Sequence, residues 1–216
     1  MRFIGDVHGK YRPYKRIIKG VTQSIQVGDM GVGFHKVRPP FPDPFLDGVT
    51  YDTNPPHYAM TKEGESHRFI RGNHDNPEVC KRQSQWIPDG HVEGDMMFIG
   101  GAVSVDQEFR TEGVDWWRDE ELSIKELDDL ITKVADIKPR VMVTHEAPEF
   151  LVDGLIIASG RGYKLDWPSR TRQAFEAMYS LHKPELWIFG HWHVSFDYME
   201  EGCRFKCLNE LEYFDI

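Results

Sequence analysis

The chain has 216 residues and a formal net charge of −9 at pH 7. This length suits a single domain whose core can fold without disulfides, and the acidic balance argues against a general nucleic-acid coat protein. No segment has the length of a membrane span. No signal peptide is expected, because a strand that reaches the functional-looking Asp6 begins at Arg2.

The three cysteines, Cys80, Cys203 and Cys207, cannot all pair with one another. We expect reduced thiols and no disulfides, as in a cytoplasmic protein. Cys203 and Cys207 lie four apart, so a metal-binding role stays open, although packing within a hairpin is the favoured interpretation.

Residues 10–19 contain five basic side chains, and apolar residues recur there at helical spacing. This pattern predicts an amphipathic helix that leads back to the next strand. Its basic residues are expected to form a solvated face. The functional alternative is that Lys10 and Arg12 reach a substrate phosphate.

Residues 31–66 contain six prolines and show little periodicity. So long a connection is typical of a lid, a binding loop or a disordered excursion. We favour a substrate-shaping lid, because the segment leaves directly from a proposed ligand. Within it, His35, Arg38 and His57 either contact substrate or are ordinary loop residues.

The remaining elements follow from periodicity and from the residues that begin and end helices. A short helix is predicted for 77–85, with strands at 96–99 and 103–105. Ser123 and Glu126 form a capping-box pattern that opens a helix ending near Ile137. A further helix is predicted for 169–182, and 195–213 alternates as antiparallel strands do.

Five apolar runs of strand length each end in side chains that bind metals or transfer protons. They occupy residues 2–8, 24–29, 69–75, 140–145 and 186–193. Open α/β sheets bind ligands at the carboxyl ends of their strands. We therefore expect the five strands to deliver these side chains to one rim of a sheet.

Seven candidate metal ligands emerge from these runs, and they are Asp6, His8, Asp29, Asn73, His145, His191 and His193. They are too many for one ion, whereas two ions that share a bridging carboxylate accommodate them. Paired ions about 3.5–4 Å apart suit in-line displacement at phosphorus. Mixed imidazole, carboxylate and amide ligands favour Mn²⁺, Fe or Zn²⁺ over Mg²⁺; Mn²⁺ is the first expectation, and Ni²⁺ is a further alternative.

The set Asp6-x-His8, Gly28-Asp29, Gly72-Asn73-His74-Asp75, His145 and Gly190-His191-x-His193 resembles the calcineurin-like metallophosphoesterase superfamily. The resemblance covers nearly the whole chain. It implies one α/β domain over 1–216, a four-layer α/β/β/α sandwich of mixed sheets with flanking helices.

The same resemblance implies a role for each residue. Asp6, His8 and His193 would hold one ion; Asn73, His145 and His191 would hold the second; Asp29 would bridge them. A hydroxide shared by the ions would attack phosphorus, and the metals would generate it near neutral pH by lowering the pKa of water. His74 would be the general acid at the leaving group, with Asp75 orienting it.

The chain departs from the Ser/Thr phosphoprotein phosphatase branch of that superfamily. That branch reads Gly-Asp-x-Val-Asp-Arg-Gly and Gly-Asn-His-Glu, whereas residues 28–33 here read Gly-Asp-Met-Gly-Val-Gly and the second motif ends in Asp75. Residues 100–121 are similar to bacterial and phage members instead. A dedicated Ser/Thr protein phosphatase is therefore not expected.

The expected activity is hydrolysis of phosphate esters, as a phosphomonoesterase or a phosphodiesterase. Arg71, Arg110 or Arg161 could clamp the phosphoryl oxygens, with Arg71 first by adjacency and ordinary ion pairs as the alternative. The substrate class stays open among nucleotides, nucleic-acid ends, phosphoproteins and small molecules. Trp116 and Trp117 could stack on a base or pack in the core. The alternative function is a non-catalytic metal-binding scaffold for partner recognition.

Overall fold

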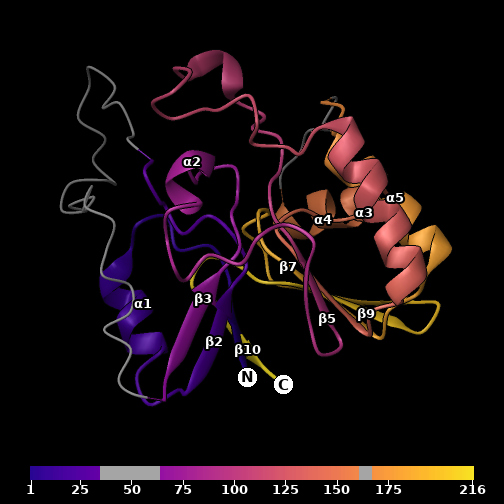
Figure 1. Ribbon diagram of the computed structural model, residues 1–216, viewed down its shortest axis with the longest axis horizontal. Helices are drawn as coiled ribbons and strands as arrows, with labels where there is room; N and C mark the ends of the chain where they lie inside the picture. The colour runs from indigo at the N-terminus through magenta and orange to yellow at the C-terminus, as the bar shows by residue number, and fades with distance from the viewer. Residues whose placement is uncertain (35–63, 161–166) are drawn as a thin grey trace.

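The computed structural model describes residues 1–34, 64–160 and 167–216, which form two β-sheets with helices outside them (Figure 1). The first sheet has the strand order β10-β1-β2-β3. Its strands are β1 (Arg2–Ile4), β2 (Gln23–Gln26), β3 (Ser66–Phe69) and β10 (Tyr213–Asp215). The first three run parallel and β10 is antiparallel to β1, so the carboxyl ends of three strands share one edge.

The second sheet has the order β4-β5-β6-β7-β9-β8. Its strands are β4 (His91–Glu93), β5 (Met96–Ile99), β6 (Val141–Thr144), β7 (Leu186–Phe189), β8 (Phe196–Glu200) and β9 (Cys203–Cys207). Strands β5, β6, β7 and β9 are parallel, and the edge strands β4 and β8 are antiparallel to their neighbours. This sheet is therefore mixed, like the first.

Helices outside the sheets include three that begin at a residue whose side chain caps them. The helices are α1 (Tyr11–Ile17), α2 (Pro77–Cys80), α3 (Ile124–Ile137), α4 (Val152–Ser159) and α5 (Arg170–Leu181), with 3₁₀ turns η1 (Gln107–Phe109) and η2 (Glu149–Leu151). Ser123 and Glu126 form the expected capping box at the start of α3. Ser169 caps α5, and Asn76 caps α2. Each cap satisfies backbone N–H groups that lack an intrahelical partner.

Three apolar clusters separate four structural layers. Ile4 and Phe69 of the first sheet pack with Tyr14 of α1, whereas Phe3 packs with Phe98 across the space between the two sheets. The outer face of the second sheet packs against α3, α4 and α5. Because successive strand residues point to opposite faces, both faces of each sheet are buried, which confirms the α/β/β/α sandwich.

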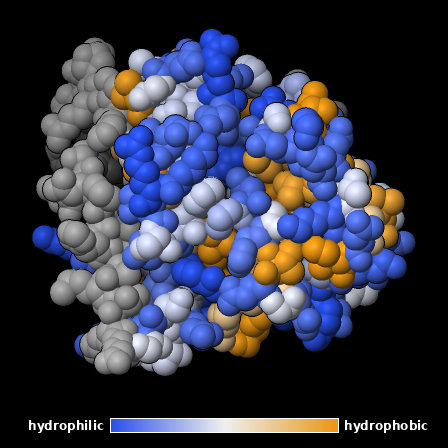
Figure 2. Space-filling view, viewed as in Figure 1, coloured by the Kyte–Doolittle hydropathy of each residue, from blue (hydrophilic) through white to orange (hydrophobic). Residues whose placement is uncertain are grey.

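The face of the molecule shown in Figure 2 is mostly hydrophilic where it is coloured, with apolar residues gathered in small areas. Within the described ranges, no helix is long and apolar enough to cross a membrane. Cys80, Cys203 and Cys207 are buried free thiols, and the two C-terminal ones lie in β9, in the hairpin where packing was the favoured role. The proposed lid falls largely on 35–63, and Arg161 falls on 161–166; both lie outside the described residues.

Three expectations about local structure need correction. Residues 103–105 are not a strand, and the helix after Asp75 ends at Cys80 rather than at residue 85. The five ligand-bearing strands do not share one sheet, because β1, β2 and β3 belong to the first sheet and β6 and β7 to the second. Segment 103–105 instead makes side-chain contacts near the ligands, and these are described below.

Replacing Phe205 by alanine should destabilise the protein by about 3–5 kcal/mol, because a large core side chain leaves a cavity. Phe205 is 0% exposed and packs against the rings of Tyr179 and Trp187. Phe109→Ala is the matched control, since that ring is 83% exposed, and it should change stability by less than about 0.5 kcal/mol. Urea unfolding measures both; equal losses would contradict the assigned core.

Candidate metal centre

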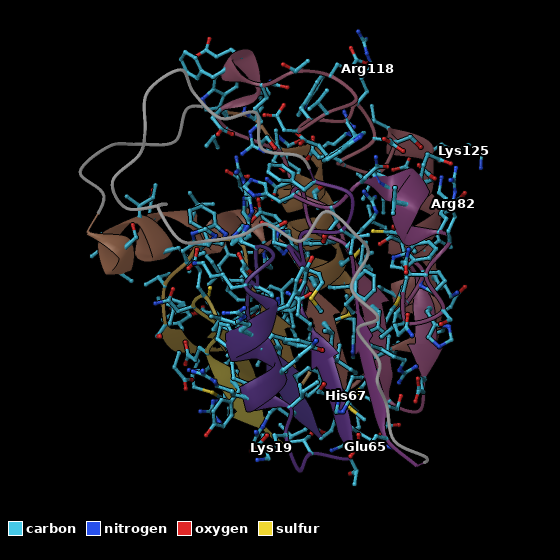
Figure 3. The ribbon with its side chains drawn as sticks, turned by 90° about the vertical axis from the view of Figure 1, so that its left-hand side faces the viewer. Lys19, Glu65, His67, Arg82, Arg118 and Lys125 are labelled. Carbon is cyan, nitrogen blue, oxygen red and sulfur yellow. The ribbon has the colours of Figure 1, made fainter. Side chains whose placement is uncertain are left out.

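The candidate ligands lie in the loops that follow the parallel strands. Asp6 and His8 follow β1, Asp29 follows β2, and Asn73 follows β3. His145 follows β6, and His191 and His193 follow β7. The carboxyl ends of parallel strands from both sheets therefore meet at the candidate ligands. His67, by contrast, lies at the far end of β3 near Glu65 (Figure 3), where its Nδ1 is 2.8 Å from Ser24 Oγ.

Four of these ligands hold the left-handed backbone conformation. The φ angles are 46° at His8, 60° at Asp29, 66° at His191 and 51° at His193. That region costs a residue with a side chain about 1–2 kcal/mol, and such strain is concentrated at functional sites. Hydrogen bonds between loops hold these turns; for example, the backbone N–H of His8 donates to the carbonyl oxygen of Asp29 at 2.7 Å.

One group of ligand atoms comprises Asp6, His8, Asp29 and His193, with all four atoms within 4.8 Å of one another. Nε2 of His193 is 3.0 Å from Oδ2 of Asp6 and 2.8 Å from Nε2 of His8. Nε2 of His8 is also 3.7 Å from Oδ2 of Asp29. The spacing lets one cation contact all four side chains.

A second group comprises Asp29, His145 and His191, also within 4.8 Å. Nε2 of His145 is 3.3 Å from Oδ1 of Asp29 and 3.2 Å from Oδ1 of Asn73. Nδ1 of His145 lies 2.8 Å from the carbonyl oxygen of Val27, which can only accept a hydrogen bond. Nδ1 therefore carries a proton, and Nε2 is the ring nitrogen that faces Asp29 and Asn73 and would bind an ion. Asp29 belongs to both groups.

Burial of the two carboxylates requires positive charge nearby. Asp6 is 0% and Asp29 1% exposed. Burial alone would raise the pKa of Asp6, but hydrogen bonds with His193 and His8 hold it below its usual value. Burial also acts against ionised Asp29, whose pKa is nevertheless far below the usual value because of the charge and the hydrogen bond of His145. A buried ionised group is stable only when it is paired or coordinates a metal.

The residues fit divalent cations in chemistry and in space. Two carboxylates, four imidazoles and one amide oxygen make a donor set suited to transition metals. Glycines let these donors approach closely. A Cβ on Gly28 would meet Cγ of His145 at 2.5 Å, one on Gly72 would meet Nε2 of His145 at 2.6 Å, and one on Gly190 would collide with Asp6.

His74 lies beside both groups and borders a cavity of about 270 Å³. Its Nδ1 is 3.1 Å from Nδ1 of His8, and its Nε2 is 2.6 Å from Nη2 of Arg110. The ring of Phe34 stacks on the imidazole at 4.7 Å. Burial, together with the nearby His8 and Arg110, lowers the pKa of His74 well below its usual value. His74 is therefore neutral in this arrangement.

Asp75 and Arg71 lie close to the ligands in sequence but make other contacts. The Asp75 carboxylate accepts backbone hydrogen bonds from Met30, Gly31, Val32 and Gly72. Within the described part of the chain, Asp75 makes these backbone bonds and not the expected bond to the His74 ring. Asp75 thus ties the loops after β2 and β3 together.

Arg71 points away from the cavity. Its Nε donates to Asp89 at 2.8 Å, and its Nη1 donates to the backbone oxygens of Asp119 and Glu120. The structure therefore brings Arg110, and not Arg71, to the cavity beside His74. The adjacency of Arg71 to the motif gave no information about the direction of its side chain.

The sequence analysis did not predict a role for several buried polar residues that lie behind the candidate ligands. Glu120 and Ser104 hydrogen-bond to each other, and Ser104 contacts Asn73. Burial raises the pKa of Glu120 to about 7, although its bonds with Ser104 act to lower it. Glu146 is fully buried, and its Oε2 lies 3.6 Å from Nε2 of His191. Of these residues, only Glu146 could have been found from the sequence, because it directly follows the candidate ligand His145.

Gly72→Ala should abolish binding at the second group, because the added Cβ would collide with Asp29 and His145. Gly154→Ala in α4 is the control: its Cβ would make ordinary contacts of 3.5–3.6 Å with Phe196, and alanine favours the helix. Equilibrium dialysis against Mn²⁺ measures the ions held per chain. Unchanged binding in folded Gly72→Ala protein would contradict this geometry.

No curated protein matches the sequence. The solved structure "GAP50 the anchor in the inner membrane complex of Plasmodium" matches with 11% identity over 97% of this chain and 71% of that chain, at a TM-score of 0.47. The phosphopantetheinyl hydrolase PptH from Mycobacterium tuberculosis matches with 13% identity over 97% and 89%, at a TM-score of 0.46.

The family model described as calcineurin-like phosphoesterase matches residues 2–195. That range contains all seven candidate ligands and His74. The protein belongs to the calcineurin-like phosphoesterase family.

Proposed function

We propose that the protein is a hydrolase of phosphate esters that uses two divalent metal ions. The observation that carries the proposal is the position of Asp29, whose carboxylate belongs to both ligand groups while His74 borders the adjoining cavity. Family membership supports the same chemistry. Asp6, His8 and His193 would hold one ion, Asn73, His145 and His191 the other, and Asp29 would bridge them.

Divalent ions bound here would polarise the phosphoryl group and lower the pKa of coordinated water. Mn²⁺ is the first candidate, with Fe, Zn²⁺ and Ni²⁺ as alternatives, since the donor set mixes nitrogen and oxygen. Monoesters and diesters both remain candidate substrates. The chain's own residues would orient the ester and manage the proton of the leaving group.

Arg110 would orient the ester, and His74 would supply the proton to the leaving group. A guanidinium carries no acceptor, so Nε2 of His74 accepts the hydrogen bond from Nη2 of Arg110, at 2.6 Å. A phosphoryl group entering the cavity offers Arg110 a more strongly charged acceptor. Once Arg110 turns to the phosphoryl oxygens, Nε2 of His74 can take up a proton from solvent and deliver it to the leaving oxygen, which departs as the alcohol. Asp106, 2.7 Å from Arg110, holds the guanidinium at the cavity between turnovers.

The direct test is hydrolysis by protein loaded with Mn²⁺. We expect release of nitrophenol from p-nitrophenyl phosphate, from bis(p-nitrophenyl) phosphate or from both, and no release after the ions are removed with a chelator. The ratio of the two rates assigns the protein as a monoesterase or a diesterase. Protein shown to hold two ions that hydrolyses neither ester with any candidate metal would contradict the proposal and favour a metal-binding scaffold.

His74→Asn should retain both ions and lower the turnover of phenyl phosphate by about 10²–10⁴-fold, the usual contribution of a general acid. The loss should be smaller for p-nitrophenyl phosphate, because nitrophenolate leaves readily without a proton. His91→Asn, at a half-exposed position in β4, is the matched control and should leave both rates unchanged. An equal fall in turnover for phenyl phosphate and p-nitrophenyl phosphate would contradict the role of His74 as general acid.

A further inference from the structure

The amide of Asn73 must face the second ligand group with its oxygen. An asparagine side chain ends in an oxygen that can bind a cation and an NH₂ that can only donate hydrogen bonds. The two ends have nearly the same shape, so the hydrogen bonds around them decide which end faces the ion. In this structure Oδ1 lies 3.2 Å from Nε2 of His145.

Ser104 holds the other end of the amide. Its Oγ lies 3.0 Å from Nδ2 of Asn73, and both residues are buried. Because Nδ2 can only donate, Oγ must accept this hydrogen bond. The hydroxyl proton of Ser104 must therefore point elsewhere, and the arrangement depends on an acceptor for it.

Glu120 supplies that acceptor. Its Oε2 accepts a hydrogen bond from Oγ of Ser104 at 2.6 Å, and its Oε1 accepts one from the backbone N–H of Ser104 at 2.7 Å. Glu120 is 3% exposed, so water does not substitute for it readily. The carboxylate thus fixes the direction of the hydroxyl, which in turn leaves a lone pair of Oγ toward Asn73.

Arg71 holds Glu120 in this position, although Glu120 lies in a loop 49 residues later in the chain than Arg71. Its Nη1 donates to the backbone oxygen of Glu120 at 3.0 Å and to that of Asp119 at 2.8 Å, and its Nε bonds to Asp89. Arg71 lies two residues before Asn73. The segment that carries the ligand is therefore tied directly to the segment that carries Glu120.

We propose that Glu120 is a positioning residue that acts through Ser104 to keep the amide oxygen of Asn73 facing the ion held with His145 and His191. This inference rests on the proposed function for the presence of that ion, although not for turnover. Partners behind metal ligands typically contribute 10–100-fold to metal affinity.

Glu120→Gln should weaken binding of the second Mn²⁺ by about 10–100-fold, because an amide NH₂ beside Ser104 Oγ can only donate, so the hydroxyl loses its acceptor and its lone pair is no longer held toward Asn73. Ser104→Ala should weaken it by a similar factor. Because both changes break one relay, the double variant should lose little more than either single variant. Affinity is measured by competition with a chelator near pH 8, above the Glu120 pKa of about 7.

An Asn73→Asp background tests the orientation itself. A carboxylate presents oxygen whichever way it is turned, so adding Glu120→Gln to Asn73→Asp should no longer weaken the second ion. A purely structural role for Glu120 would weaken binding in both backgrounds. Ser104→Ala carries the same comparison if Glu120→Gln does not fold, as judged by thermal unfolding without metal.

Glu121→Gln is the matched control, since Glu121 is the adjacent buried glutamate. Its carboxylate accepts from Ser169 Oγ and the backbone N–H of Thr171 instead, so both ions should bind as in the unmodified chain. Wild-type affinity in Glu120→Gln, additive losses in the double variant, or an equal loss after Asn73→Asp would overturn the inference. Two bound ions without hydrolysis would contradict the proposed function and leave this inference standing.

Discussion

The site depends on one buried carboxylate, that of Asp29, which belongs to both candidate ligand groups. Asp29 is 1% exposed, and its Oδ1 accepts the backbone N–H of His74 at 2.7 Å and lies 3.3 Å from Nε2 of His145. Its Oδ2 faces His8 on the other side. A carboxylate so deeply buried stays ionised only when positive charge or a metal ion lies beside it. This need explains why imidazoles from both sheets converge on Asp29.

The sandwich makes this convergence possible. Each sheet places the carboxyl ends of parallel strands at one edge, and packing the sheets face to face brings the two edges together. Short connections then give precise positions to the ligands, at the cost of left-handed backbone at four of them. Hydrogen bonds such as that from the backbone N–H of His191 to Asp6, at 3.1 Å, connect the loops of one sheet with those of the other. Local strain is thus offset by bonds that only the complete fold supplies.

The structure brings together the candidate ligands that the sequence indicates, each of which combines a strand signal with a distinctive side chain. The capping box at Ser123 is similarly local, and the structure contains it. The division of the strands between two sheets was not predictable from strand pattern alone, because pairing depends on contacts distant in the chain. The directions of Arg71 and Arg110 depend on the fold in the same way. Ser104 and Glu120 carry no motif, since their role comes from where residues 103–105 and 119–120 lie beside Asn73.

The central claim is that Asp29 bridges two adjacent ions, and electron paramagnetic resonance of the Mn²⁺-loaded protein tests it most directly. Ions about 3.5–4 Å apart with a shared oxygen ligand should give the spectrum of an exchange-coupled pair at two Mn²⁺ per chain. In Asp29→Asn protein the coupling should be lost or strongly weakened. A spectrum of isolated Mn²⁺ at two ions per chain, or saturation at one ion, would contradict the account.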